Sequence, residues 1–248
     1  MTRYLILLSC IYSSVAFAQQ QISNSSFENW ENRGAKMEPV GWNSLTSADM
    51  CTFCSFGVSQ RVFKDKVEFR SGTCGIRIES TSAIGGIIVN GTVTTGRVTA
   101  PSILPSKGYN RMVLGKEEFR LTFTDQPDSL VFWAKYSITD GSDSALVSFL
   151  LHDEFEMTDP PRPEKEQQAM AVARKTFQTN SKWQRVSVPF KYVDAAKPNS
   201  LYLLATFSAS YQAGKGNANA TLWVDDVQLV YNRLAQNATT VTFSSAGN

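Results

Sequence analysis

Short segments of strand-forming residues, separated by turn-forming residues, run through most of the chain and limit what it can fold into. The segments are rich in Val, Ile, Leu, Phe and Thr, and Gly, Pro, Asn, Asp or Ser residues bound them. Strands at this spacing predict an antiparallel β-sandwich or barrel. The clearest segments are 74–80, 86–93, 119–123, 129–138, 145–151, 184–192, 200–210 and 221–231.

Helical periodicity is confined to one place in the sequence. The segment KEQQAMAVARKTF, residues 165–177, predicts one short helix at an edge or inside a long connection. The acidic, proline-containing residues 153–166 are expected to form a loop. We therefore expect an all-β domain with at most one short helix.

The two ends of the chain differ in character from the part between them. Arg3 precedes an apolar run, and Ala16-Phe17-Ala18 has the small-residue pattern of a signal-peptide cleavage site. We expect residues 1–18 to be a cleaved signal peptide, 19–231 the folded domain and 232–248 a polar tail. This predicts a secreted, periplasmic or cell-surface protein, and the alternative is a lipoprotein with Cys10 lipidated.

Charge and hydropathy exclude two classes of partner. The 24 Lys and Arg residues nearly balance the 22 Asp and Glu residues. Nucleic acids and anionic membrane surfaces select for clustered positive charge, so we expect neither as a partner. No segment after the leader approaches the roughly 20 apolar residues of a transmembrane helix, so we expect no membrane insertion. Oligomeric state has no signal in the sequence.

Three cysteines follow the leader: Cys51, Cys54 and Cys74. Export favours a disulfide, and the odd count leaves one thiol over. We predict one structural disulfide that joins Cys74 to Cys51 or Cys54, and take Cys54 as its partner. Zinc is disfavoured because a structural site needs four ligands and His152 is the only histidine.

The segment TLWVDDVQLVY, residues 221–231, carries two adjacent carboxylates in an otherwise apolar strand. Strand side chains alternate between faces, which puts Asp225 on the more apolar face. A buried carboxylate must be hydrogen-bonded, ion-paired or bound to a metal. Asp226 is expected to face solvent and keep an edge strand soluble. Asp225 shares its face with Trp223, Val227, Leu229 and Tyr231.

Glu28, in the segment NSSFENW, supplies a second carboxylate near the start of the domain. In sandwiches whose first and last strands pair, Glu28 and Asp225 would lie together. With backbone carbonyls from a loop such as residues 71–73, they would form an oxygen-rich cage that suits calcium. We therefore predict a structural Ca2+ site formed by Glu28, Gly72 and Asp225. The alternative is that Asp225 only accepts backbone N–H bonds.

The early N-x-x-F-E motif with a following G-W, and the terminal V-D-D-V-x-L, together resemble jelly-roll carbohydrate-binding modules. More specifically, the chain resembles the bacterial carbohydrate-metabolism domain (PCMD) family, over roughly residues 22–231. This resemblance implies a galactose-binding-like, antiparallel jelly-roll β-sandwich on secreted or surface proteins, and implies no established reaction. It rests on the order and spacing of SSFENW, GGIIVNGTVTTG, PDSLVFWAKYSITDGSDSALVSFLL, WQRVSVPFKY and VDDV.

We expect the partner to be an oligo- or polysaccharide, and aromatic side chains to contact it. Sugars bind to sandwiches through rings laid against pyranose faces, with polar groups nearby. Alternation sets Trp133 and Lys135 on one face, which we take as the concave one. Tyr136 is also predicted to contact the ligand, and it reaches this face only if a bulge intervenes. Tyr109 and Trp183 lie at strand ends or loops and complete the predicted contacts, although any of these rings can instead fill the core.

Two other function classes remain open. A glycoside hydrolase needs two carboxylates that face a cleft. The best candidates are Asp153, Glu154 and Glu156, which leave a predicted strand where a loop could overhang a groove. The sequence assigns no catalytic residue. A structural or adhesion module, with a protein partner, is the third class.

Overall fold

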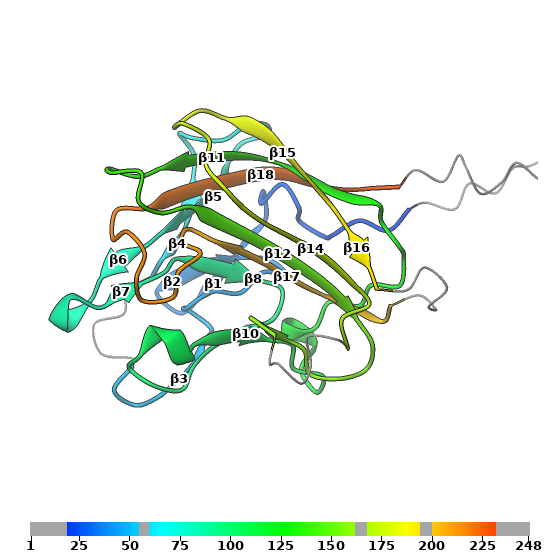
Figure 1. The fold of residues 1–248 in the computed structure, drawn as a ribbon, viewed down its shortest axis with the longest axis horizontal. Helices are drawn as coiled ribbons and strands as arrows, with labels where there is room; N and C mark the ends of the chain where they lie inside the picture. Colours follow the sequence, from blue (N-terminus) through cyan, green and yellow to red (C-terminus); the bar gives the residue numbers. More distant parts are fainter. Residues whose placement is uncertain (1–18, 55–59, 162–167, 194–199, 232–248) are drawn as a thin grey trace, which may run out of the picture.

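The computed structural model describes residues 19–54, 60–161, 168–193 and 200–231. The predicted signal peptide and the predicted tail lie outside the described residues. The chain forms three stacked layers of β-strands (Figure 1). Two five-stranded sheets make a sandwich, and a smaller four-stranded sheet covers the outer face of one of them.

The strand order of the two large sheets is that of a jelly roll. Each neighbouring pair within these sheets is antiparallel. The first sheet has the order β15 (Gln184–Pro189), β11 (Ser129–Ser137), β18 (Thr221–Val230), β5 (Gly75–Glu79) and β4 (Val62–Asp65). The second sheet has the order β16 (Lys191–Tyr192), β14 (Ala171–Phe177), β12 (Ala145–His152), β17 (Tyr202–Ser208) and β8 (Thr92–Thr94). The structure confirms the predicted all-β jelly-roll sandwich.

Short elements complete the fold. The third sheet has the order β13 (Thr158–Asp159), β10 (Tyr109–Arg111), β9 (Arg97–Ala100) and β3 (Asp49–Met50), and β3 is parallel to β9. Two hairpins join β1 (Trp30–Arg33) to β2 (Lys36–Pro39) and β6 (Thr81–Ser82) to β7 (Ile88–Val89). The 3-10 turns that lie wholly within the described residues are η1 (Ile84–Gly86), η2 (Pro105–Lys107) and η3 (Glu117–Phe119). None of the helices in the described ranges is long and apolar enough to cross a membrane.

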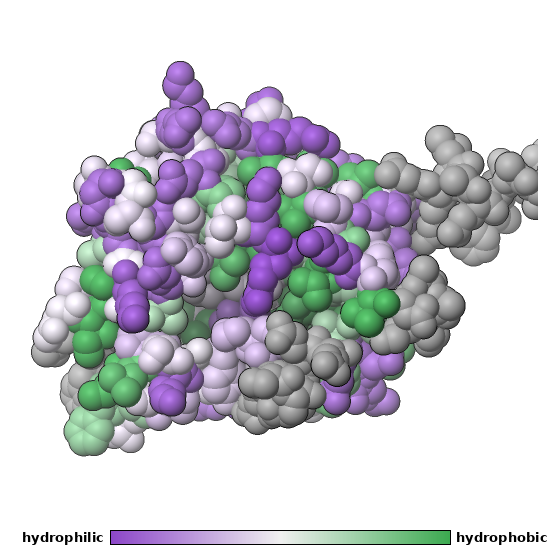
Figure 2. Space-filling model, viewed as in Figure 1, coloured by the Kyte–Doolittle hydropathy of each residue, from purple (hydrophilic) through white to green (hydrophobic). Residues whose placement is uncertain are grey.

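The main hydrophobic core lies between the first and second sheets. Strand alternation supplies it, because every second side chain of each central strand points inward. Phe207 lies at its centre, with its ring centroid 5.1 Å from Phe132, 5.5 Å from Phe149 and 6.1 Å from Trp42. The surface in Figure 2 is otherwise mixed in polarity, with hydrophobic residues gathered near the region of β3 and the β6–β7 hairpin.

Two predictions of secondary structure were wrong. The part of the predicted helix 165–177 that the structure describes contains the strand β14, and residues 165–167 lie outside the described residues. In β14 the apolar residues Ala171, Ala173 and Phe177 are buried while residues 174–176 are exposed, so pairing with β12 decided the conformation. The expected strand 119–123 forms only an isolated bridge, between Thr122 and Tyr202.

Strand β18 changes its core-facing parity at a β-bulge. Its register against β11 shifts between Val131 and Trp133, and Asp226 has a positive φ of 50°. Leu222 and Val224 face the core before the bulge, and Val227 and Leu229 face it afterwards. The predicted single face of Trp223, Asp225 and Val227 is therefore wrong. The predicted edge position of Asp226 is also wrong, because β18 lies in the middle of its sheet.

We expect Phe207→Ala to destabilise the protein by about 3–5 kcal/mol, because it leaves a cavity among three aromatic rings. Phe53→Ala is the matched control, since the Phe53 side chain is 76% exposed and its removal should cost less than about 0.5 kcal/mol. Urea unfolding followed by tryptophan fluorescence measures both. Equal losses in the two variants would contradict this position of the core.

Candidate ligand pocket

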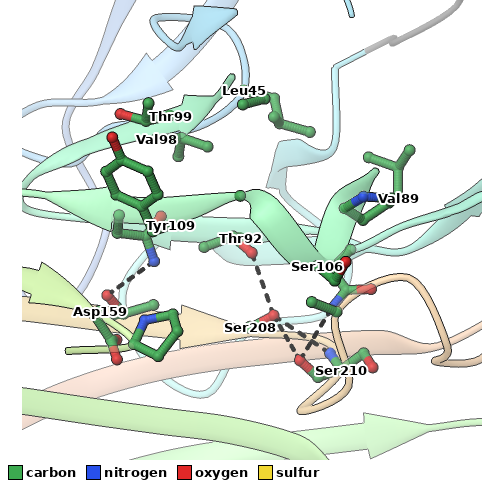
Figure 3. A pocket seen from close by; sticks show the side chains of 18 of the residues that line it. Leu45, Val89, Thr92, Val98, Thr99, Ser106, Tyr109, Asp159, Ser208 and Ser210 are labelled. Carbon is green, nitrogen blue, oxygen red and sulfur yellow. Dashed lines mark hydrogen bonds between the residues drawn. The ribbon is translucent and has the colours of Figure 1, made fainter. Parts of the chain in front are cut away.

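A pocket of about 690 Å³ lies between the outer face of the second sheet and the third sheet (Figure 3). Strands β8, β12, β14 and β17 supply one wall. Strands β9, β10 and β13, the 3-10 turn η2 and nearby loops supply the other. The volume is within the usual range of small-molecule sites, roughly 300–1,000 Å³.

Hydroxyl groups line the wall formed by the second sheet. The hydroxyl of Thr92 donates to Ser208 Oγ at 3.2 Å, and Ser208 Oγ donates to the carbonyl of Ser210 at 2.8 Å. Thr206 Oγ1 accepts the amide of Asn110, from the third sheet, at 3.3 Å. Thr92, Ser208 and Ser210 lie on the same side of the pocket in Figure 3. These bonds fix the orientation of the hydroxyls before any ligand arrives.

An ion pair closes one end of the polar wall. The guanidinium of Arg174 pairs with the carboxylate of Asp159, and its Nε donates to Ser148 Oγ at 3.1 Å. The Asp159 side chain is only 3% exposed, whereas that of Arg174 is 35% exposed. Burial raises the pKa of Asp159 above its ordinary value, and Arg174 together with the hydroxyls of Ser148 and Thr206 opposes the rise. Arg174 therefore offers the pocket a positively charged hydrogen-bond donor that Asp159 holds in place.

Two oxygen atoms near the pocket have no hydrogen-bond partner among the described residues. They are Thr99 Oγ1 and Asn90 Oδ1, and both residues line the pocket. Thr99 is 5% exposed, so its hydroxyl is shielded from bulk water. A buried polar atom without a partner costs free energy, and a ligand with donor groups can recover it.

The opposite wall is mainly apolar, although Thr99, Ser102, Ser106 and Asn110 on that side also line the pocket. Leu45 and Val98 face the hydroxyl groups across the pocket in Figure 3, and Tyr109 lies at one side. Outside this wall the exposed side chains of Phe53 and Ile103 also line the pocket. The pocket thus has one polar and one apolar wall, which suits a ligand with the same two-sided character.

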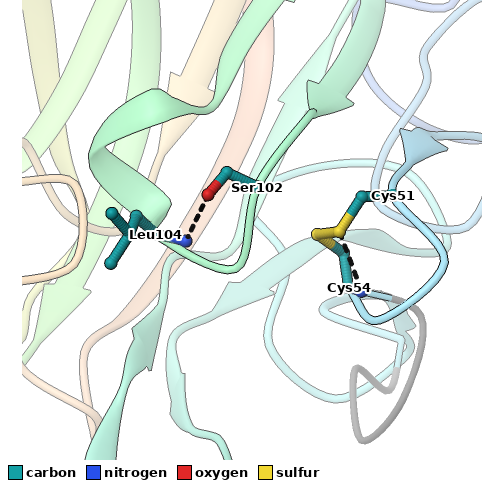
Figure 4. Close-up of a disulfide and its surroundings, with 4 residues drawn as sticks. All are labelled: Cys51, Cys54, Ser102 and Leu104. Atoms are coloured by element: carbon teal, nitrogen blue, oxygen red, sulfur yellow. Dashed lines mark hydrogen bonds between the residues drawn. A yellow bond between two sulfur atoms is a disulfide. The ribbon is translucent and has the colours of Figure 1, made fainter.

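A disulfide between Cys51 and Cys54 closes the turn beside the apolar wall (Figure 4). The predicted Cys54–Cys74 disulfide is therefore wrong. Cys51 and Cys54 share one turn, with their Cα atoms 5.0 Å apart, and Cys51 N donates to Ala100 O of β9 at 2.9 Å. Cys74 is a buried free thiol that packs against Phe27 O and Glu28, away from this turn.

The structure places one of the five predicted glycan contacts, Tyr109, in the pocket. Trp133 and Lys135 lie on the outer face of the first sheet, on the far side of the core, and not on a concave face beside the pocket. The guanidinium of Arg70 is 4.4 Å from the Trp133 ring centroid, and Lys135 pairs with Glu68 at 2.9 Å. Trp183 is half-buried before β15 and does not line the pocket.

Tyr136 is a core residue. Its side chain is 2% exposed, so the prediction that Tyr136 contacts a bound glycan is wrong. Burial raises the pKa of its hydroxyl far above the ordinary value of 10.0, and the nearby carboxylates Asp143 and Asp140 add to the rise. The bulge that would have brought Tyr136 to the face of Trp133 occurs before Trp133, so the two residues keep opposite faces.

Most residues of the polar wall were missed by the sequence reasoning, although a signal existed for some. Thr206, Ser208 and Ser210 recur at every second position of a segment recognised as a strand. That recurrence indicates a polar face opposite the apolar Leu203, Ala205 and Phe207. Arg174 had no such signal, because it fell inside the predicted helix.

A second cluster of polar groups holds the two ends of the domain together. The backbone N–H groups of Arg70 and Ser71 donate to Asp225 Oδ2 at 2.8 and 3.1 Å. The backbone N–H and hydroxyl of Thr73 donate to the Glu28 carboxylate at 3.0 and 2.5 Å. Gly72, between these donors, has a φ of +73°, and a Cβ there would lie 1.9 Å from Glu28 Oε1. We call loop 70–74, Glu28 and Asp225 the clasp.

Asp225 is fully buried under loop 70–74 and not in the sandwich core. Burial raises its pKa, and the backbone bonds from Arg70 and Ser71 oppose the rise. The alternative to a metal site was that Asp225 only accepts backbone N–H bonds, and the structure shows these bonds. Glu28 and Asp225 are both oxygen ligands of the kind calcium prefers, but backbone N–H groups of the loop face them, and no cluster of three or more His, Cys, Asp or Glu side chains occurs among the described residues.

Neither a protein-family model nor a curated protein sequence matches the chain, so the resemblance to the PCMD family stays a prediction. Solved structures similar to the chain include the module TmCBM61 in complex with beta-1,4-galactotriose, with 10% identity, TM-score 0.39 and coverage of 86% of this chain and 98% of that one.

Two further solved structures come from named bacteria. The K1 cleaved adhesin domain of Lys-gingipain from Porphyromonas gingivalis W83 has 11% identity, TM-score 0.42 and coverage of 84% and 96%. A cyclase from Fischerella sp. TAU has 10% identity, TM-score 0.43 and coverage of 86% and 96%. Identities and TM-scores this low carry no argument about function.

We predict that Glu28→Gln lowers stability at pH 7 and lowers it less at pH 3. Burial raises the pKa of Glu28, but the hydrogen bonds from Thr73 and Cys74 outweigh it and hold the pKa below its ordinary 4.5. Ionised Glu28 therefore stabilises the fold above pH 4.5, and this is lost as the pH falls through the lowered folded value.

Urea unfolding at both pH values, of protein stripped of metal with EDTA at neutral pH and transferred to metal-free buffers, measures this difference. The exposed Glu154→Gln is the matched control and should change stability at neither pH. A loss in Glu28→Gln that is equally large at pH 3 and pH 7 would contradict the role of the carboxylate charge.

Proposed function

We propose that the protein is a carbohydrate-binding domain whose ligand places one or two sugar units in the pocket between the second and third sheets. The observation that supports this most is the pairing of a wall of hydroxyl, amide and guanidinium groups with an apolar wall that includes an aromatic ring. A pyranose has hydroxyl groups around its edge and C–H groups on its faces. The two walls match these two kinds of surface.

Specific groups are assigned to each part of the sugar. Arg174 and the hydroxyl of Thr176, both exposed on β14, bind ring hydroxyls from the polar wall. Asn90 Oδ1 and Thr99 Oγ1 accept hydrogen bonds that no described residue supplies. Tyr109 and Val98 pack against the C–H face. The bonds of Arg174 to Asp159 and Ser148, and of the Asn90 amide nitrogen to the carbonyls of Ser210 and Gln212, pre-organise two of these groups and so reduce the entropy lost on binding.

Binding is favoured over hydrolysis as the function of this pocket. Glycosidases use two carboxyl groups on either side of the scissile bond. Among the described residues that line the pocket, the only carboxylate is Asp159, and it is already paired with Arg174. Asp153, Glu154 and Glu156 are exposed residues that do not line it.

The proposed place of action is outside the cytoplasm. Residues 1–18 are proposed to direct export, as the sequence pattern indicates. The Cys51–Cys54 disulfide suits an oxidising compartment. Polysaccharides of a cell surface or of the surroundings are the ligands that such a domain would meet.

The proposed site can be tested against the site expected from the sequence. A screen of the purified protein against oligo- and polysaccharides, with reducing-sugar release measured in parallel, first identifies a ligand. Tyr109→Ala should then weaken its binding about tenfold in isothermal titration calorimetry, the loss of roughly 1.5 kcal/mol expected for one ring contact. Trp133→Ala, on the far side of the core, should leave the affinity within about twofold.

Arg174→Met should weaken binding further, and Arg185→Met is its matched control because Arg185 is exposed on β15 of the first sheet. If Arg174→Met fails to fold because Asp159 has lost its partner, Thr176→Val tests the polar wall instead and should also weaken binding. Weaker binding in Trp133→Ala together with normal binding in Tyr109→Ala would move the site to the outer face of the first sheet. Release of reducing sugars from a ligand would mean that the protein hydrolyses it, and the proposed binding function would be replaced by a hydrolase function.

We also propose that the clasp holds a structural calcium ion, with Glu28, the carbonyl of Gly72 and Asp225 as ligands. The ion would neutralise a buried carboxylate and stiffen loop 70–74. Ca2+ added to EDTA-treated protein at 100 times its Kd should stabilise the fold by about 2.7 kcal/mol. Glu28→Gln or Asp225→Asn should remove this increment. An unchanged melting midpoint, with no calcium in elemental analysis, would reject the ion.

A further inference from the structure

Exposed apolar side chains are concentrated at the mouth of the pocket. In the described part of the chain nine large apolar side chains are exposed, and three of them line the pocket: Phe53 at 76%, Ile103 at 57% and Tyr211 at 48% exposure. Leu104, next to Ile103, is 53% exposed. We call these four residues the rim. Exposed apolar groups gathered beside a pocket mark a binding surface more often than isolated ones do.

The backbone holds the rim in place. The Cys51–Cys54 disulfide closes the turn that carries Phe53, and Cys51 N donates to Ala100 O at 2.9 Å. Leu104 N donates to Ser102 Oγ at 3.2 Å, beside that turn in Figure 4. A Cβ at Gly214 would lie 3.2 Å from Pro105, so the loop after Tyr211 packs against η2. The rim side chains are thus presented to solvent from constrained turns, which lowers the entropy cost of binding to them.

Three of the four rim residues, Phe53, Ile103 and Leu104, continue the apolar wall, whereas Tyr211 follows Ser210 of the polar wall. Ile103 follows the strand β9, which supplies Val98 to the apolar wall, and Phe53 follows β3, the neighbour of β9. Arg174, Thr206 and Ser208 belong to the second sheet, opposite. Figure 2 shows hydrophobic residues gathered on this part of the molecule. A ligand with only hydroxyl groups would leave the rim in water.

We infer that the ligand of this pocket is a sugar that carries an apolar substituent, such as an alkyl, acyl or aryl group. The sugar occupies the pocket against the polar wall, and the substituent leaves through the mouth and packs against Phe53, Ile103 and Leu104. This inference rests on the proposed carbohydrate-binding function and adds the chemical class of the ligand. The affinity is set by two separable parts, one polar and one apolar.

Titration calorimetry of the full protein with paired glycosides tests the inference. The probes are the methyl and octyl β-glycosides of glucose, galactose and mannose, with the octyl compounds kept as monomers, and octyl sulfate as an amphiphile without sugar. For the sugar that binds, the octyl glycoside should bind at least about tenfold more tightly than the methyl glycoside, because it buries several more CH2 groups.

Two double variants assign that gain to the rim. Phe53→Ser with Ile103→Ser should bring the octyl affinity to within about threefold of the methyl affinity of the same variant. Val67→Ser with Val193→Ser is the matched control, since these side chains are 85% and 61% exposed and do not line the pocket. This control variant should keep the full difference between the octyl and methyl affinities. All four positions are exposed, so the variants should fold.

The outcomes separate this inference from the proposed function. Equal affinity for methyl and octyl glycosides overturns the inference and leaves carbohydrate binding intact. Octyl sulfate that binds as tightly as the octyl glycosides overturns both, because the sugar then contributes nothing, and so does an absence of binding by every probe. Phosphatidylcholine vesicles that carry the same sugar on a lipid tell a membrane-held ligand from a soluble one.

Discussion

The second sheet is covered on both faces, and the alternation of its side chains determines what each covered face can do. On β17, Leu203, Ala205 and Phe207 point into the sandwich core, while Thr206 and Ser208 point to the third sheet. The core face therefore supplies the hydrophobic free energy of folding. The other face is closed by hydrogen bonds and an ion pair, and such a polar interface can leave room for a ligand where an apolar core would close up.

The third sheet depends on polar contacts for its position. Asn110 of β10 donates to Thr206, and Asp159 of the edge strand β13 pairs with Arg174, so two neighbouring strands of this sheet are tied to the second sheet by polar groups. A buried ion pair adds little net stability compared with apolar packing, but the loss of one partner leaves an uncompensated charge. These contacts therefore specify where the third sheet sits more than they stabilise it, and that position creates the pocket.

The fold was more predictable from the sequence than the site. Alternating segments such as 129–138 and 200–210 carry a strong period-two signal, so their assignment as strands needed no tertiary information. The strand β14 resembled a helix because Ala, Arg and Lys favour helices, and only its pairing with β12 overrode that preference. The pocket depends on which sheets stack, and that arrangement follows from the topology. The bulge at Asp225 and Asp226 reversed the faces of one strand, which no period-two argument can foresee.

The clasp and the pocket lie on opposite outer faces of the sandwich, and this separates the contacts that stabilise the chain ends from the proposed binding site. Asp225 and loop 70–74 cover the first sheet, whereas Arg174 and Thr206 cover the second, with the hydrophobic core between them. Substitutions at sites that share no partners have nearly additive effects on free energy. A weakened clasp should therefore lower the fraction of folded protein without changing the affinity of the molecules that remain folded. The contacts that join the chain ends and the residues that form the pocket therefore belong to different sheets.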